Sequence, residues 1–162
     1  MRKRIVYGVV SAAVAALTTG VVLAGAATAS SQGTIHVRTF SQGESFIDNA
    51  ATGPSPGDVL VVRDVWKNDE GHVVGHGRLV CTVTYVAGNE DIQLQCLLTG
   101  HTSGGDLTAQ GLFTEPGRRP HHPTVFWAVT GGTGSFAGAT GSVRVHEVSE
   151  EESDVTFTLS TP

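Results

Sequence analysis

The feature that most constrains the fold is a succession of short β-forming runs from Thr34 to the end of the chain. Clusters of Gly, Pro, Asn and Asp separate the runs. No window after residue 29 shows the apolar spacing of an amphipathic helix. The predicted strands are Thr34–Gln42 (with an extension toward Asp48), Asp58–Trp66, Val73–Val86, Asp91–Thr99, Leu107–Phe113, Thr124–Thr130, Ser142–Val148 and Asp154–Leu159. Eight evenly spaced strands predict an all-β antiparallel domain, either a sandwich or an up-and-down barrel.

A glycine-rich connection joins two of these strands. Gly131, Gly132 and Gly134 stand between the apolar run that ends at Val129 and the run that begins at Val143. A phosphate-binding loop is the competing interpretation, but no Lys-Ser or Lys-Thr pair follows the glycines, and neither does a helical pattern. We therefore interpret the three glycines as a structural turn.

The N-terminal segment has the parts of a secretory signal peptide. Three basic residues, Arg2 to Arg4, precede an apolar run, and the small residues Ala27 and Ala29 form a cleavage site. We expect residues 1–29 to be removed, so that residues 30–162 form a single secreted, extracellular domain. The alternative is an uncleaved membrane anchor, because the apolar run is longer than usual.

The charge of the remaining chain argues against nucleic-acid binding. Loss of the signal leaves 7 of the 10 Lys and Arg residues against 15 acidic residues, a net charge of 7 − 15 = −8. Nucleic-acid binders normally present a basic face, and Arg118 and Arg119 are the only adjacent basic pair that remains.

The two cysteines are predicted to face one another in a hairpin. If Gly88-Asn89 forms a two-residue turn, Cys81 lies directly opposite Cys96. In an exported protein such a pair indicates a disulfide, with two buried free thiols as the alternative. Strand alternation then gives this hairpin an apolar face, made by Leu79, Cys81, Val83, Tyr85, Ile92, Leu94, Cys96 and Leu98.

Seven histidines raise the question of a metal site, and we expect none. His72 and His76 lie in a strand and turn, where a spacing of four does not converge on one ion. His121 and His122 are flanked by prolines in a loop, and no cysteine or carboxylate completes a ligand set. No cofactor is expected either.

Most acidic residues lie in predicted turns or in the run Glu147–Asp154, which we interpret as a solvated loop, and three carboxylates are exceptions. Glu44, Phe46 and Asp48 alternate onto one side of the first extended segment, and Asp64 lies inside the second strand. A carboxylate at the mouth of an apolar cavity has its pKa raised by desolvation and can act as a general acid or base. The alternative is a solvated or turn-capping carboxylate.

The order of several motifs resembles the allene oxide cyclase and dirigent barrel superfamily. The most specific piece is Thr130-Gly-Gly-Thr-Gly134 followed by Ala137-Gly-Ala-Thr-Gly141. Other pieces are Ser55-Pro-Gly-Asp58, Asn68-Asp-Glu-Gly71, Leu79-Val-Cys-Thr82 and Gly105-Asp-Leu-Thr-Ala-Gln-Gly111. The resemblance implies a small eight-stranded antiparallel up-and-down barrel, calycin-like, whose apolar lumen encloses one small ligand, and it suggests a trimer.

The same resemblance implies a function. Members of the superfamily cyclise reactive small molecules or steer their coupling, and the cyclases use a carboxylate on the first strand. Asp48 best matches that position, with Glu44 as the second choice. The predicted lumen residues are Phe46, Leu79, Val83, Tyr85, Leu94 and Trp127. We expect an isomerase or cyclase acting on a small apolar molecule; the alternatives are a carrier of a lipophilic molecule and a barrel filled by its own side chains.

Overall fold

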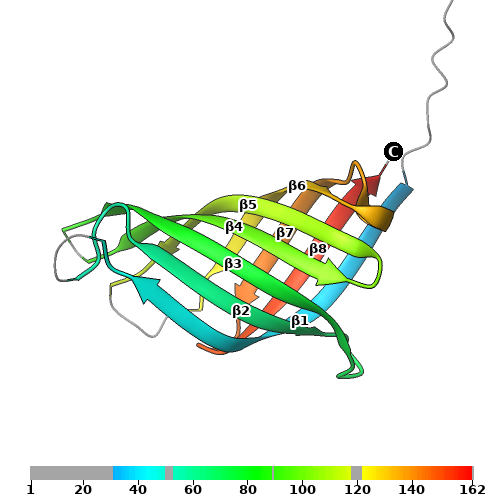
Figure 1. Ribbon diagram of the computed structural model, residues 1–162, viewed down its shortest axis with the longest axis horizontal. Helices are drawn as coiled ribbons and strands as arrows, with labels where there is room; N and C mark the ends of the chain where they lie inside the picture. The colour runs from blue at the N-terminus through cyan, green and yellow to red at the C-terminus, as the bar shows by residue number, and fades with distance from the viewer. Residues whose placement is uncertain (1–30, 50–52, 89, 118–121, 162) are drawn as a thin grey trace, which may run out of the picture.

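The computed structural model describes residues 31–49, 53–88, 90–117 and 122–161 and shows a closed barrel of eight antiparallel strands (Figure 1). Each strand pairs with the next, and β8 closes the barrel against β1. The strands are β1 (Ser31–Ile47), β2 (Val59–Lys67), β3 (Val73–Val86), β4 (Ile92–Thr102), β5 (Gly105–Glu115), β6 (Thr124–Gly132), β7 (Thr140–Glu147) and β8 (Glu152–Thr161). Of the two architectures that the sequence left open, the barrel is the correct one.

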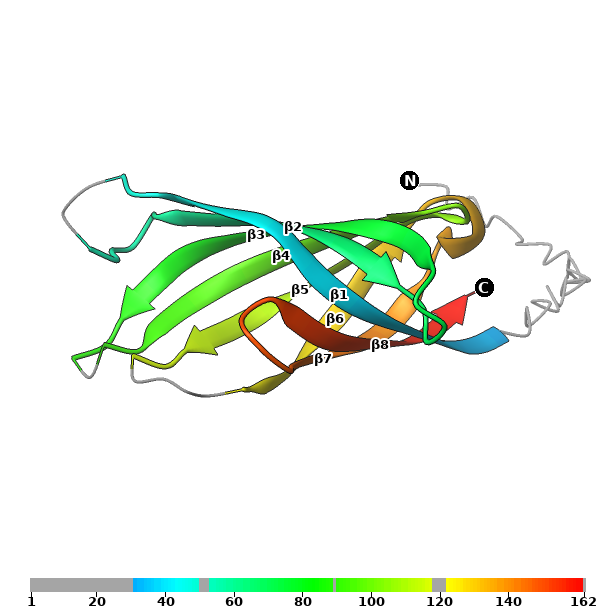
Figure 2. The same cartoon turned by 90° about the horizontal axis from the view of Figure 1, so that it is seen from below.

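The predicted signal peptide, residues 1–29, lies outside the described residues. Within the described part of the chain, no helix is long and apolar enough to cross a membrane. The first and last strands run side by side, with Ser31 opposite Thr161, so the two ends of the barrel domain meet at one end of the barrel (Figure 2).

Large side chains close that end of the barrel. Trp66 of β2 is 1% exposed and its ring centroid lies 5.6 Å from that of Phe157 of β8. The indole extends over Gly77 and Gly100 of the neighbouring strands: a Cβ atom at Gly100 would lie 1.9 Å from the indole ring. The two glycines therefore make room for the largest side chain of the core.

The predicted disulfide is present between Cys81 and Cys96, which are paired across β3 and β4. The predicted two-residue turn is wrong. Ala87 donates its N–H to the carbonyl of Asp91, so three residues rather than two lie between the last hydrogen-bonded pair, and Glu90 takes a left-handed φ of 70°. The cysteines still face each other because an extra residue in β3 compensates for the extra residue in the turn.

That extra residue is a β-bulge at Thr84, and it reverses the direction of Tyr85. The register steps from Val83, which pairs with Leu94, to Tyr85, which pairs with Gln93. Beyond the bulge the alternation changes phase. Tyr85 is consequently 54% exposed on the outside of the barrel, and the prediction that it faces the lumen is wrong.

The glycine-rich connection links β6 to β7 through a single 3₁₀ turn, Gly134–Phe136. Gly131 and Gly134 have φ values of 148° and 58°. A Cβ atom on Gly134 would lie 2.4 Å from the carbonyl oxygen of Gly104 in the β4–β5 turn, and one on Gly132 would lie 2.5 Å from the carbonyl oxygen of Asp106. The two connections at this end of the barrel thus pack backbone against backbone.

A buried carboxylate organises the loop between β1 and β2. Asp58 is fully buried, and it accepts hydrogen bonds from the backbone N–H groups of Asn49 (2.8 Å) and Ser55 (2.7 Å). The Ser55 hydroxyl donates a third, at 3.1 Å. The hydrogen bond from Asn49 is the largest cause that holds the pKa of Asp58 below its usual value. The acidic end of the Ser55–Asp58 motif is therefore structural.

Substitution of Gly134 by alanine should lower the thermal unfolding midpoint. A left-handed φ costs an alanine about 1–2 kcal/mol, and the contact with Gly104 adds to this cost. Gly33→Ala is the matched control, because its Cβ would meet nothing within 4 Å. Equal midpoints for the two variants would contradict the structural interpretation of the turn.

His36 predicts a pH dependence of stability. Its Nδ1 lies 2.7 Å from Asp69 Oδ1 and its Nε2 lies 3.1 Å from Asp154 Oδ2. The hydrogen bond to Asp154 is the main cause that raises the pKa of His36. A raised pKa contributes stability that is complete below the unfolded-state value, about 6.5, and is lost as the pH rises through the folded-state value.

The thermal midpoint of the wild type should therefore exceed that of His36→Gln by more at pH 6 than at pH 9. Thermal unfolding of both proteins at the two pH values measures this difference. The account of His36 fails if the difference between the two midpoints is the same at both pH values.

Candidate functional site

The half of the barrel opposite Trp66 contains a cavity of about 480 Å³. It opens at the end of the barrel where β1, β3, β5 and β7 finish and β2, β4, β6 and β8 begin. The wall is mainly apolar and comprises Phe46, Leu60, Val62, Leu79, Val83, Ile92, Leu94, Phe113, Pro123, Val125, Trp127, Val145 and the Cys81–Cys96 disulfide. A volume of this size suits one small organic molecule.

The structure places five of the six predicted lumen residues on this wall. Phe46, Leu79, Val83, Leu94 and Trp127 line the cavity, and Tyr85 does not. The lumen is therefore open at this end, whereas Trp66 and Phe157 fill it at the other end.

A β-bulge in β1 brings Glu44 to the cavity. Ser41 pairs with Asp64 and Gly43 pairs with Arg63, so Gln42 is the additional residue. Without the bulge, Ser41 and Glu44 would point to opposite faces. With it, both line the cavity. Glu44 makes no hydrogen bond or ion pair with any described residue, so its carboxylate is available to a ligand.

Asp48, the first-choice catalytic residue, does not line the cavity. It follows the last residue of β1, Ile47, and is exposed to solvent. β1 ends at Ile47, so the alternation that places Phe46 at the cavity does not extend to Asp48. Of the two predicted carboxylates, only Glu44 is at the cavity.

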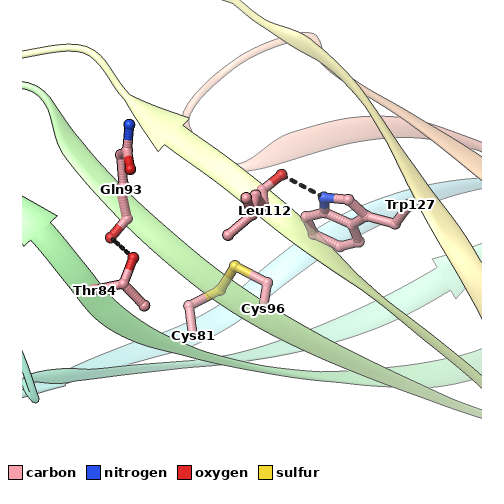
Figure 3. The surroundings of a disulfide bond; sticks show 6 residues. All are labelled: Cys81, Thr84, Gln93, Cys96, Leu112 and Trp127. Atoms are coloured by element: carbon pink, nitrogen blue, oxygen red, sulfur yellow. Dashed lines mark hydrogen bonds between the residues drawn. A yellow bond between two sulfur atoms is a disulfide. The ribbon is translucent and has the colours of Figure 1, made fainter.

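Trp127 is held in the wall by its neighbours on β5 (Figure 3). Its indole Nε1–H donates to the carbonyl oxygen of Leu112 at 2.9 Å. The ring lies over Gly111, where a Cβ atom would come within 2.1 Å of it. Pairing between β5 and β6 ends at Gln110 and Ala128, so the side chain of Trp127 joins the two strands beyond the last backbone pair.

Three further carboxylates line the cavity and were missed from the sequence. They are Glu115 at the end of β5, Glu147 at the end of β7, and Glu150 in the turn before β8. In an up-and-down barrel, all odd-numbered strands finish at the same end. Acidic residues at the ends of the first, fifth and seventh strands are therefore neighbours of one opening, and this is the signal that could have revealed them.

Asp64 is a second carboxyl group, after Asp58, whose pKa is altered. It lies between Val62 and Trp66 on the inward face of β2, opposite Ser41. Burial raises its pKa, and the charge of Arg78 offsets part of that increase. Asp64 is not itself part of the cavity wall: it borders the floor, beside the indole of Trp66.

No group of three His, Cys, Asp or Glu side chains among the described residues could hold a metal ion. His72 and His76 do not form part of such a group, and His121 lies outside the described residues.

Comparison with solved structures finds the same barrel in several enzymes. Pyocyanin demethylase is 25% identical with a TM-score of 0.67, over 78% of this chain and 99% of that one. The exo-specific intermolecular Diels-Alderase AbnU is 12% identical with a TM-score of 0.63, over 80% and 98%. A pterocarpan synthase dirigent protein is 16% identical with a TM-score of 0.64, over 96% and 97%.

Among curated proteins, none matches the sequence significantly. The model of the allene oxide cyclase barrel-like domain matches residues 26–159, nearly the whole of the predicted mature chain. The resemblance seen in the Thr130–Gly141 motif is thereby confirmed, and the chain belongs to the allene oxide cyclase barrel-like family.

Proposed function

We propose that this protein is a secreted isomerase or cyclase that binds a small, largely apolar molecule inside its barrel. The observation that carries the proposal is the 480 Å³ apolar cavity, open at one end, with Glu44 on its wall. Apolar walls hold a substrate in one folded conformation and so lower the entropic cost of an intramolecular reaction. The Cys81–Cys96 disulfide supports export to an oxidising compartment.

In the proposed mechanism Glu44 transfers the proton. A substrate with an epoxide or an enone rearranges when a base removes a proton beside the reacting carbon and an acid protonates the developing alkoxide or enolate. Glu44 is on the wall, next to the apolar surface of Phe46 and Val62. It is therefore within reach of a molecule that fills the cavity from the mouth.

The family supports a catalytic barrel. Pyocyanin demethylase, at 25% identity, is an enzyme on the same scaffold. The second candidate function, a carrier without chemistry, uses the same cavity, and the apolar wall by itself supports it equally well. The carboxylate on the wall favours the enzyme, because a carrier of an apolar molecule has no need of a charged group there.

Glu44→Gln should preserve the fold and the ligand affinity. It should lower turnover by roughly 10²- to 10⁴-fold, the rate factor that general acid–base catalysis usually contributes. The substrate for this assay is the lipophilic compound extracted from the protein in its native secretion and identified by mass spectrometry. Unchanged turnover in Glu44→Gln would remove Glu44 from the mechanism. Binding without any conversion by the wild type would establish the carrier.

Asp64→Asn is the matched comparison, since Asp64 is the other interior carboxyl on β1 and β2. A raised pKa in the folded state means that stability is lost as the pH rises through that value. The neutral variant should therefore unfold at a higher temperature than the wild type at pH 7, and at the same temperature near pH 3. If its turnover falls and that of Glu44→Gln does not, Asp64 is the proton-transfer group.

We also propose a homo-oligomer, a trimer by the family resemblance. Its interface would cover the apolar side chains on the outer surface of β3 to β6: Val80, Leu97, Leu112 and Phe126 are each at least 40% exposed. Light scattering of the wild type should give three times the mass of one chain. The substitution Phe126→Glu should lower the measured mass to that of a single chain. A monomeric wild type would refute the proposal.

A further inference from the structure

A second, smaller depression lies on the outer surface of β2 and β3, which run side by side (Figure 1). Its volume is about 250 Å³. Val62 and Leu79 face the cavity inside the barrel, so the next residues, Arg63 and Arg78, face outward by strand alternation. We call this depression the arginine pocket; its lining residues are Gln42, Arg63, Asp64, Val65, His76 and Arg78. It is separate from the cavity, and the proposed function does not use it.

Two positive charges face each other in the arginine pocket. Arg63 and Arg78 are directly opposite in the antiparallel pairing of β2 with β3. Like charges in this arrangement destabilise a sheet. An anion between the two guanidinium groups would replace this repulsion by two attractive, charge-assisted contacts. The pairing therefore indicates a binding site for an anion.

Contacts with the backbone hold both guanidinium groups in place. That of Arg63 lies over Gly43, in the bulge of β1, where a Cβ atom would come within 2.8 Å of Nη2 of the arginine. Arg78 donates a hydrogen bond from Nη1 to the carbonyl oxygen of Gly77, at 2.6 Å. Planar guanidinium groups held in this way present their remaining N–H groups to an oxyanion.

The net charge of the arginine pocket is positive. Asp64 is the one acid among its six lining residues, and the charge of its carboxyl group interacts with that of Arg78. Arg63 makes no hydrogen bond or ion pair with any described residue. All 15 acidic residues of the chain belong to its described part, because the other residues include no Asp or Glu. No acidic side chain of this chain therefore neutralises Arg63.

We propose that the arginine pocket binds a phosphate group between the guanidinium groups of Arg63 and Arg78. A phosphate monoester carries a charge of about −1.5 to −2 at neutral pH and balances two guanidinium groups, whereas a carboxylate balances one. Each guanidinium group can donate two parallel hydrogen bonds to phosphate oxygens. Gln42 and His76 add polar side chains to the same pocket. The phosphate belongs either to a free phosphorylated molecule or to a lipid headgroup.

Titration of the nitrogen-15-labelled mature protein with inorganic phosphate tests the proposal. Near neutral pH, with sodium chloride used to keep the ionic strength constant, the amide signals of residues 62–66 and 75–79 should shift and reach saturation. Sodium acetate should bind about tenfold more weakly than phosphate, because a carboxylate carries a single charge.

Variants connect the binding to the two arginines. Arg63→Gln and Arg78→Gln should each raise the Kd of inorganic phosphate about tenfold, since each removes charge-assisted hydrogen bonds. Arg144→Gln is the matched control: it removes the same charge from β7, across the barrel, where Arg144 lies 4.0 Å from Asp154. It should leave the Kd unchanged.

Thermal unfolding gives a second measurement on the same variants. Without phosphate, Arg63→Gln should unfold at a higher temperature than the wild type, because the repulsion across β2 and β3 is removed. Added phosphate should raise the midpoint of the wild type and leave that of Arg63→Gln unchanged.

Vesicles distinguish the two sources of the phosphate. If it belongs to a lipid, phosphatidylcholine vesicles that contain phosphatidic acid should sediment the wild type and leave Arg63→Gln in solution. If it belongs to a free molecule, inorganic phosphate should bind and neither protein should sediment. Either result supports the site and assigns its source.

Three results would overturn the proposal. Shifts that do not saturate, or that are equal in the wild type and Arg63→Gln, would mean an adventitious ion only. Acetate that binds as tightly as phosphate would remove the preference for phosphate. A lower mass of Arg63→Gln in light scattering would show that the pair contacts a carboxylate of a neighbouring copy instead. None of these results bears on the cavity inside the barrel.

Discussion

The structure depends on alternation of side chains around a closed barrel, and on the bulges that interrupt this alternation, two of which decide what faces the cavity. In a closed sheet every residue faces either the lumen or the solvent, so one additional residue exchanges the two sets along the rest of the strand. The bulge at Gln42 turns Glu44 and Phe46 inward. The bulge at Thr84 turns Tyr85 outward. These two single-residue insertions therefore decide that Glu44 faces the cavity and that Tyr85 does not.

The size of the cavity follows from an uneven distribution of large side chains. A barrel of eight strands is just wide enough for side chains to fill it. At one end Trp66 spans the lumen because Gly77 and Gly100 leave it room, and Phe157 completes the seal. At the other end the disulfide and medium-sized aliphatic groups cover the wall without meeting across it. Trp127, the largest side chain there, is kept at the wall by its hydrogen bond to Leu112.

Much of the fold could be predicted from the sequence because its signals are local. Alternation and turn residues located all eight strands, with β3 correct at both ends (Val73–Val86). The predicted pairing of Cys81 with Cys96 is also correct, although the two-residue turn from which it is derived is wrong. The extra residue in the turn and the bulge at Thr84 cancel, so the register is right at the cysteines and wrong only between Tyr85 and the turn.

The site was less predictable because it depends on the phase of side-chain alternation in each strand and on where the strands end. A bulge leaves only a weak mark in a single sequence: Gly43 is a glycine inside a strand, which can indicate a bulge, but Thr84 resembles an ordinary strand residue. Asp48 was favoured by alternation and by the family resemblance, but the strand ends at Ile47. Glu115, Glu147 and Glu150 are far apart in the chain, and only the closed topology shows that they share one opening with Glu44.

The lumen of this barrel is open and apolar rather than filled by side chains. Crystals of the mature protein under xenon pressure test this property, because xenon enters apolar cavities and shows strongly in electron density. The account predicts a xenon atom within the barrel, between Leu79, Leu94 and Val125 and beside the disulfide. A lumen without xenon, with Phe113 and Trp127 folded across it, would contradict the account.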